Sequence, residues 1–301
     1  MVNVSFIIPS YNSYQTIGHT LKSIFDLKSF EYVRNVIVVD SSDDGKTREL
    51  LQKFNNTRLI IVSLDKKTSP ALGRNMGAKL AQGDLLCFID SDVFLDENWL
   101  EYVLKAHQSG CQVGCGSISA PDFQQKSKLA LAQLYLQFNE TLYVGEPRSV
   151  TLVPSCNMFC QKELFLRVRG FPMLRASEDT VFCLSLVKIV KIWFVPSAKV
   201  FHIFREDWNG FKRNQILLGQ YISIYRRIFY KSWYYKGIFP VILFPAFLII
   251  KSIRITTRIY KAGNDHFSKY LYSIFIYKLG IFYWSFGFIK GCFSNDENIR
   301  N

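Results

Sequence analysis

Two aspartates stand one residue apart in the segment Asp90-Ser91-Asp92, directly after the apolar run Leu85–Ile89. Carboxylates this close together repel each other unless a cation neutralises them. Hard divalent ions such as Mg²⁺ or Mn²⁺ take oxygen ligands from one or two carboxylates and complete their shell with substrate phosphates. The triplet therefore indicates a metal site for a phosphorylated substrate, and a solvated turn is the alternative.

A second acid pair, Glu178-Asp179, opens a helical stretch with the sequence EDTVFCLSL. Its apolar residues predict a buried side, and the two acids are expected in the first turn, exposed at one rim. A carboxylate in this position can act as a general base, or it can simply complement the helix dipole.

Further polar residues stand where elements are expected to begin or end. Asp40 ends an apolar run, and His202 follows the strand-like segment Lys199–Phe201. Arg74 and Asn75 lie near the start of a helix, where a cation and the helix N-terminus both favour an anion. The alternatives are a turn residue for Asp40, a structural role for His202 and a surface charge for Arg74.

The first hundred residues alternate between short apolar runs and helical stretches. We expect strands over 4–8, 36–39, 59–62 and 85–89, and helices over 14–27, 47–54 and 70–81. Continuous apolar strands separated by helices predict a parallel sheet that is covered on both faces. Ligands bind beyond the carboxyl ends of such strands, which is where Asp40 and Asp90 stand.

Between residues 97 and 200 the pattern is mixed. Helices are expected over 97–108, 127–138 and 161–168, and short strands near 112–118, 151–154 and 191–195. The seven cysteines fit no zinc pattern and no disulfide framework, so most of them are expected as small core residues in a reducing compartment.

Several blocks carry a resemblance to a known family: FIIPSYN (6–12), VIVVDSSDDG (36–45), ALGRNMGAKLAQGD (71–84), LLCFIDSDV (85–93), SCNMFCQKELF (155–165), GF (170–171), SEDTVF (177–182) and VFH (200–202). Their order and spacing resemble glycosyltransferase family 2 over residues 3–205. The resemblance implies the GT-A fold, an α/β architecture with a Rossmann-like, mostly parallel central sheet and helices on both faces. It also implies an inverting transfer of sugar from a nucleotide-diphosphate sugar, with a UDP-sugar favoured.

The resemblance assigns a donor site to six residues: Pro9, Tyr11, Asp40, Arg74, Asn75 and Asp90. In it, Pro9 and Tyr11 line the nucleotide pocket and Asp40 accepts a hydrogen bond from the base. Arg74 and Asn75 lie near the diphosphate, and Asp90 contacts the ribose or a metal-bound water. The family places Asp-Gly-Ser after the equivalent of Asp40, whereas this chain has Ser41-Ser42-Asp43-Asp44, which leaves the choice of base open.

The same resemblance implies that Asp92 binds Mg²⁺ or Mn²⁺ directly, together with Asp90 and His202. The metal would stabilise the charge that develops on the leaving nucleoside diphosphate. Asp179 would be the general base that takes the proton from the attacking hydroxyl, with Glu178 orienting the acceptor.

The last hundred residues differ from the rest in charge. Residues 208–293 hold thirteen basic residues and one acidic residue, and they are rich in Phe, Tyr, Ile and Leu. This mixture indicates an anionic membrane surface and not nucleic acid. Apolar stretches at 237–250 and 272–289 are at or below the length that spans a bilayer, and basic residues lie on every side of them.

These features predict two parts. Residues 1–205 form a GT-A catalytic domain, with a nucleotide-sugar-binding half (1–95) and an acceptor half (96–205). Residues 206–301 form a helical, membrane-associated tail. We favour helices embedded in the cytoplasmic leaflet over full spans, and a soluble helical cap at a dimer interface is a third interpretation. The N-terminus has no secretory signal, so the catalytic part is expected at the cytoplasmic face of the cell membrane.

The predicted function is metal-dependent transfer of a sugar to a hydroxyl of a glycan or lipid-linked acceptor. A polyprenyl-phosphate hexosyltransferase is the nearest alternative; its acceptor is a phosphate, which needs no strong base. A catalytically inactive membrane scaffold with the same fold is the alternative of another class. The acid pair Glu178-Asp179 argues against the first, and the intact acids at 90, 92 and 179 argue against the second.

Overall fold

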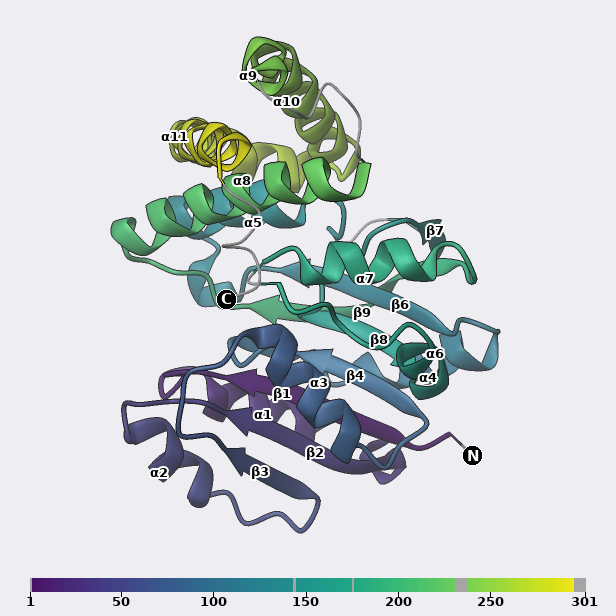
Figure 1. Cartoon of the computed structure of the whole chain (residues 1–301). Coiled ribbons are helices and arrows are strands. Elements are labelled where there is room, and N and C mark those ends of the chain that lie inside the picture. Colours follow the sequence, from purple (N-terminus) through teal and green to yellow (C-terminus); the bar gives the residue numbers. More distant parts are fainter. Residues whose placement is uncertain (1, 143–144, 175, 231–237, 295–301) are drawn as a thin grey trace. The chain divides into compact units, whose positions relative to one another are not determined.

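The computed structural model describes residues 2–142, 145–174, 176–230 and 238–294. The chain divides into two compact units (Figure 1). The sheet unit comprises Met1–Ser119 and Tyr143–His202, and the helical unit comprises Ala120–Leu142 and Ile203–Asn301. The chain therefore enters the helical unit first at residues 120–142, a segment that the sequence alone placed in the catalytic domain.

One sheet in the order β3-β2-β1-β4-β8-β6-β9-β5, with β7 paired to β9, organises the sheet unit. Its strands are β1 (Val4–Ser10), β2 (Val33–Asp40), β3 (Leu59–Ser63), β4 (Leu85–Ile89), β5 (Val93–Leu95), β6 (Val113–Ser119), β7 (Arg148–Val150), β8 (Asn157–Gln161) and β9 (Ile192–His202). The first four strands pair in parallel, as expected. Beyond them, β8 runs antiparallel to β4 and β6, while β5 and β7 run antiparallel to β9.

Helices cover both faces of this sheet, because the side chains of its apolar strands point alternately to the two sides. The helices are α1 (Ile17–Phe25), α2 (Lys46–Gln52), α3 (Pro70–Leu80), α4 (Trp99–Gln108), α6 (Lys162–Arg167) and α7 (Glu178–Leu186), with a 3-10 turn at Phe30–Tyr32. On one face Phe88 of β4 packs on Phe165 of α6 at 5.2 Å between ring centroids, and Phe165 packs on Phe182 of α7. On the other face Trp99 of α4 packs on Phe6 of β1 at 5.7 Å.

The prediction of a strand near 151–154 was wrong in position. Residues 151–154 carry no strand, and β7 lies just before them. Pro154 offers no N–H to a ladder, which limits pairing there. The next strand along the chain is β8, which the sequence pattern did not predict. It pairs with β4 on one side and β6 on the other and so joins the two halves of the sheet. All seven cysteines are buried and free, as expected of core residues.

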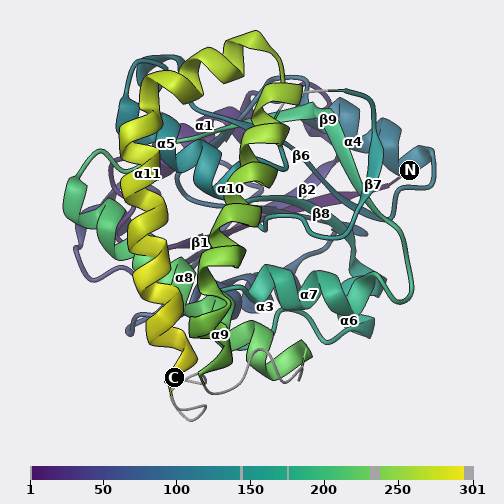
Figure 2. The ribbon, with the colours of Figure 1, turned by 90° about the horizontal axis from the view of Figure 1, so that it is seen from above.

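The described residues of the helical unit form a 3-10 turn (Asp122–Gln124) and the helices α5 (Lys128–Phe138), α8 (Trp208–Tyr230), α9 (Phe239–Ile242), α10 (Phe244–Lys261) and α11 (Asn264–Cys292). The long helix α11 packs on α8 and α5 (Figures 1 and 2). Glycines allow the backbones of α8 and α11 to approach closely: a Cβ at Gly219 would meet the carbonyl of Trp284, and one at Gly287 would meet that of Ile216. Within the described ranges, α11 is the one helix long and apolar enough to cross a membrane.

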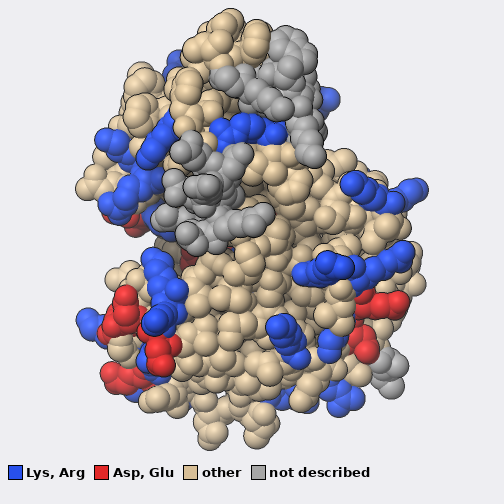
Figure 3. All heavy atoms as spheres, viewed as in Figure 1, with Lys and Arg blue, Asp and Glu red and all other residues tan. Residues whose placement is uncertain are grey.

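Large apolar side chains remain exposed along one side of α11. They are Leu271, Phe275, Leu279, Phe282 and Phe286, which we call the α11 stripe. Spacings of three and four residues place them on one face of the helix. Phe275 is 81% exposed and Phe282 is 65% exposed. In the view of Figure 3, red Asp and Glu side chains gather mainly over the sheet unit, whereas the helical unit shows mostly basic and uncharged residues.

Candidate active site

The Asp90-Ser91-Asp92 turn connects the buried strand β4 to β5. Asp90 accepts a backbone hydrogen bond from Val93 through its carbonyl, at 3.1 Å. Ser91 is held by two partners: its hydroxyl lies 2.6 Å from the Ser13 hydroxyl, and its carbonyl accepts from the Thr20 hydroxyl at 3.1 Å. The turn is therefore fixed to the segment after β1, and both aspartate side chains stay partly accessible.

Asp92 and His202 face each other because β5 and β9 pair antiparallel with Val93 opposite His202. The Asp92 Oδ1 lies 3.9 Å from the His202 Nε2, and their side chains are 40% and 15% exposed. A carboxylate oxygen and an imidazole nitrogen are donors that Mn²⁺ accepts. The described residues contain no group of three or more His, Cys, Asp or Glu placed to hold a metal. An ion held by this pair would need phosphate or water for its remaining ligands.

Arg74 lies inside the protein on α3, which begins at Pro70 with Ser69 as its N-cap. A Cβ at Gly77 would lie 2.5 Å from Ile7, so glycine lets α3 pack directly on β1. The Arg74 side chain is 3% exposed; its Nη2 donates to Asp90 and its Nη1 donates to Glu178 at 2.8 Å. Burial opposes the charge of Arg74, but Asp90 and Glu178 outweigh this and raise its pKa, so it stays protonated.

The acid pair occupies the first turn of α7, after Ser177 in the left-handed region at φ +64°. Glu178 is buried, contrary to the expectation that both acids are exposed, because Arg74 binds it from inside. Burial and the neighbouring Asp179 raise the pKa of Glu178 to about 7. Asp179 is half-buried and accepts from the backbone N–H of Thr180 at 2.7 Å and of Ser155 at 3.4 Å. Burial raises the pKa of Asp179 despite these bonds.

A buried thiol that sequence reasoning assigned to the core lies among these groups. Asp90, Asp92 and Asp179 raise the pKa of Cys156 above its ordinary value, in addition to the larger effect of burial, while Arg74 opposes them. The fold thus brings Asp90 and Asp92 close to Asp179, which is about ninety residues away in the sequence. The signal for Cys156 was present in the block SCNMFC, but a cysteine there has no distinctive spacing.

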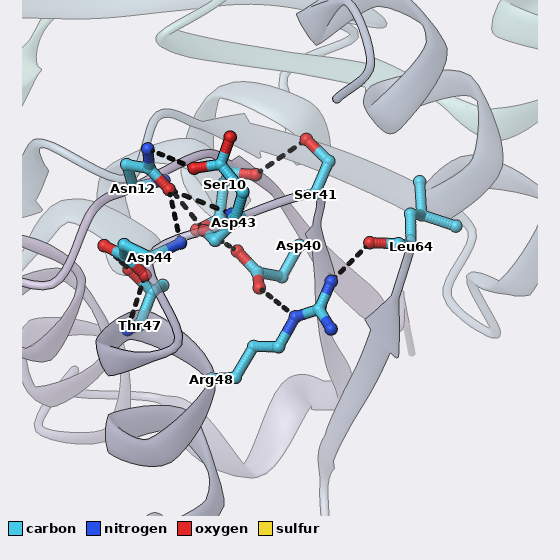
Figure 4. A network of polar contacts seen from close by, with 10 residues as sticks. Ser10, Asn12, Asp40, Ser41, Asp43, Asp44, Thr47, Arg48 and Leu64 are labelled. Atoms are coloured by element: carbon cyan, nitrogen blue, oxygen red, sulfur yellow. Dashed lines mark hydrogen bonds and ion pairs between the residues drawn. The ribbon is translucent and has the colours of Figure 1, made fainter. Parts of the chain in front are cut away.

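Asp40 lies at the end of β2 and is completely buried. Its Oδ1 accepts from the Ser42 hydroxyl at 2.6 Å, and its Oδ2 lies 3.8 Å from the Nε of Arg48 without a hydrogen bond (Figure 4). The nearby Ser10 hydroxyl is also buried without a partner. Two buried polar atoms without hydrogen-bond partners are uncommon in one place, which makes this strand end a candidate binding position.

The segment after β1 interlocks with the segment after β2. Asn12, at φ +50°, donates to Asp43 at 2.7 Å, and the Tyr11 hydroxyl donates to the same carboxylate at 3.0 Å. These bonds lower the pKa of the exposed Asp43. The ammonium of Lys67 lies 3.9 Å from the centre of the Tyr11 ring. Neither Asp43 nor Lys67 was expected here. Asp43 departs from the family's usual sequence after Asp40, and nothing in the sequence distinguished Lys67.

Pro9 and Asn75 are both held by structural contacts. Pro9 pairs with Val39 in the sheet, and a Cβ at Gly73 of α3 would lie 3.1 Å from its ring. The Asn75 amide is engaged by the backbone of Phe171, donating to its carbonyl at 2.8 Å and accepting from its N–H at 2.9 Å. Phe171 belongs to the GF block of the sequence, which predicted no role for it, and the structure places it beside Arg74.

Comparison with known proteins gives a consistent result. The profile of Glycosyl transferase family 2 matches residues 5–168. Poly(ribitol-phosphate) beta-N-acetylglucosaminyltransferase TarP of Staphylococcus aureus (strain N315) is 31% identical over 252 residues, covering 79% of this chain and 75% of TarP. The protein named "Putative teichuronic acid biosynthesis glycosyltransferase TuaG" of Bacillus subtilis (strain 168) is 28% identical over 195 residues, covering 62% of this chain and 72% of TuaG.

A solved structure agrees on the fold. The crystal structure of S. aureus TarS 1–349 in complex with UDP-GlcNAc matches with a TM-score of 0.55 and 19% identity, over 75% of this chain and 67% of that one. This likeness confirms the GT-A fold expected from the sequence blocks.

Proposed function

The chain belongs to glycosyl transferase family 2, and on that premise we propose that it transfers a sugar from a UDP-sugar, with inversion, to a hydroxyl of a cell-wall polymer. The observation that carries this proposal is the meeting of the two acid pairs: Arg74 contacts both Asp90, from the strand-end pair, and Glu178, from the α7 pair. A donor-binding group and an acceptor-activating group must lie this close for one displacement to occur.

The nucleotide is proposed to bind at the carboxyl ends of β1 and β2. The unpartnered buried oxygens of Ser10 and Asp40 support this, since a base could supply the missing hydrogen bonds. Pro9 and Tyr11 would line the pocket. Because Asp40 is completely buried, the base reaches it only if the segment around Ser42 moves on binding.

The diphosphate is proposed to bind at Asp92 and His202 through Mg²⁺ or Mn²⁺. The ion, when bound, would neutralise the negative charge that develops on the leaving nucleoside diphosphate. Asp92 and His202 would hold it, since Asp92 directly precedes β5 and the pairing of Val93 with His202 fixes their separation. The Asp90 carboxylate, engaged by Arg74, is left to contact the ribose or a metal-bound water.

Asp179 is proposed as the general base. Burial raises its pKa above the ordinary value, which makes the carboxylate a stronger proton acceptor, and the backbone donors at Thr180 and Ser155 hold it in one orientation. Glu178 is proposed to orient the acceptor from beside it. The other acids of the site have other proposed roles, Asp90 and Asp92 toward the donor and Glu178 toward the acceptor, so a single displacement with inversion is the proposed course.

The acceptor is proposed to be a hydroxyl of a polyol-phosphate or uronic-acid polymer, by likeness to TarP and TuaG. A hydroxyl acceptor needs a base, which favours this function over transfer to a polyprenyl phosphate. An inactive scaffold would have no reason to keep Asp92, Asp179 and the buried Arg74 network.

The helical unit is proposed to hold the enzyme at the cytoplasmic face of an anionic membrane. One side of α11 is buried against protein helices, including Tyr277 and Phe288, while the α11 stripe is exposed on the other side. The exposed apolar side can contact lipid while the other side stays packed on protein, and we propose that it does so in the cytoplasmic leaflet. The excess of basic residues supports attraction to anionic lipid.

A transfer assay tests the proposal. Purified protein is incubated with a panel of UDP-sugars, with or without Mn²⁺, and with poly(ribitol phosphate), a teichuronic acid polymer or a lipid extract as acceptor. We expect Mn²⁺-dependent labelling of a polymer and a product whose anomeric configuration, read by NMR, is inverted. Labelling of the lipid extract alone would support the polyprenyl-phosphate alternative, and a retained configuration would remove Asp179 as base.

A further inference from the structure

The sequence placed Arg74 next to the diphosphate, but its surroundings point to another task. Its side chain is 3% exposed, and both terminal nitrogens are used by carboxylates from different elements, Asp90 after β4 and Glu178 on α7. Its Nε is buried without a partner. Little guanidinium surface is therefore left for a ligand.

The groups around Arg74 form a supported network inside the sheet unit. The Phe171 ring lies 5.6 Å from the guanidinium carbon of Arg74 and 4.6 Å from the ring of Phe182 on α7. Phe171 is held through its backbone by Asn75, the next residue on α3 after Arg74. At Gly170, φ is +70° and a Cβ would lie 2.6 Å from the Asn75 Oδ1, so glycine is needed for this close approach.

We propose that Arg74 is a positioning residue that holds the donor-binding turn at Asp90 and the acid pair on α7 in a fixed arrangement. Phe171, itself held by Asn75, packs against Arg74 and supports it. This rests on the proposed function, whose two acid pairs it connects. Removing one member of a buried ion network destabilises a protein much more than removing one member of an exposed ion pair, because a buried charge is left without a partner. Displacement of a reacting group by about 1 Å can cost about a hundredfold in rate.

A binding series separates this role from diphosphate binding. Affinities of uridine, UMP and UDP, each with Mn²⁺, are measured by calorimetry for the wild type, Arg74→Met and Arg74→Lys. A positioning role predicts that the ratio of UDP to UMP affinity changes by about twofold or less in Arg74→Met. A loss of tenfold or more that appears only with UDP would make Arg74 a diphosphate ligand and overturn the proposal.

Kinetics give the second readout. We expect kcat of Arg74→Met to fall about a hundredfold with little change in the KM for the UDP-sugar, and Arg74→Lys to recover about tenfold of that loss. Lys79→Met, an exposed charge on the same helix, serves as the matched control and keeps wild-type kinetics. Normal kcat in Arg74→Met would overturn the proposal.

A third measurement does not depend on activity. Unfolding by urea is followed for Arg74→Met, Glu178→Gln and the double variant, and we expect the double variant to be less destabilised than the sum of the two single changes. Full additivity would show that the two side chains share no network and would overturn the inference. If Arg74→Met does not fold, the same cycle is run with Arg74→Lys. A wild type that binds UDP but transfers no sugar would contradict the proposed function, while this cycle would still decide on the network.

Discussion

The sheet unit and the helical unit differ in the kind of energetically costly group that each contains. The sheet unit buries charge: Arg74 and Glu178 are shielded from water, and Asp40 is completely enclosed. The helical unit exposes apolar surface, with Phe275 and Phe282 more than half accessible. Burying charge and exposing large apolar groups are both costly. The contrast is what the proposed function requires, with a charged, phosphate-bearing ligand proposed for the first unit and a membrane surface for the second.

The largest effect is expected at the general base of the sheet unit. Asp179→Asn should lower the rate of transfer about a hundredfold or more, because the acceptor hydroxyl loses its proton acceptor. UDP affinity and vesicle binding should stay within about twofold, since neither uses Asp179. Turnover and calorimetry measure the two effects. Glu178→Gln should cost less, and near-normal turnover of Asp179→Asn would leave this acid with a helix-capping role only.

Next in size is the response of donor binding to metal. Asp92→Asn should lower the Mn²⁺-dependent part of UDP affinity about tenfold or more, because one of two protein ligands is weakened. Binding in EDTA should not change. Glu97→Gln, which removes an exposed carboxylate of the same unit, is the control. If both variants respond to Mn²⁺ like the wild type, Asp92 does not hold the ion.

The helical unit should respond in the opposite manner. Replacing Phe275 and Phe282 by Ser should lower partitioning onto vesicles containing anionic lipid by about tenfold, since two large apolar groups no longer leave water. Transfer to a soluble acceptor should be unaffected. Phe123→Ser, at a residue 71% exposed in the same unit but outside α11, is the control. Equal partitioning of both variants in a flotation assay would contradict a membrane-facing α11 stripe.

The smallest expected effect concerns the pH dependence of stability. Burial, followed by Asp179, raises the pKa of Glu178 from 4.5 to about 7 in the folded protein. The folded state thus holds a proton that the unfolded chain releases, so this stabilisation is present below pH 4.5 and is lost as pH rises through about 7. The Tm should fall over this window less in Glu178→Gln than in the wild type. The exposed Glu163→Gln should keep the wild-type slope, and an identical slope in Glu178→Gln would place the titration elsewhere.

Local patterns were enough to predict the N-terminal half of the sheet. The buried strands β1, β2, β3 and β4 and the helix α3, with its Ser69 cap, follow from apolar runs and capping residues that act over a few positions. The positions of Asp40 and Asp90 at strand ends followed from the same runs. Membership of glycosyltransferase family 2 could also be predicted from the sequence, because it depends on the order of sequence blocks and not on tertiary contacts.

Tertiary structure decided what these residues touch. The sequence placed Arg74 near the diphosphate, with a surface charge on the helix as the alternative. In the structure its side chain is buried, and its partner Glu178 is 104 residues away along the chain. Asp92 meets His202 only because β9 returns beside β5. The assignment of residues 120–142 to the helical unit depends on α11 packing on α5. Side-chain pairing across such separations is set by the energy of the whole fold, because no local propensity distinguishes a buried partner from a solvated one.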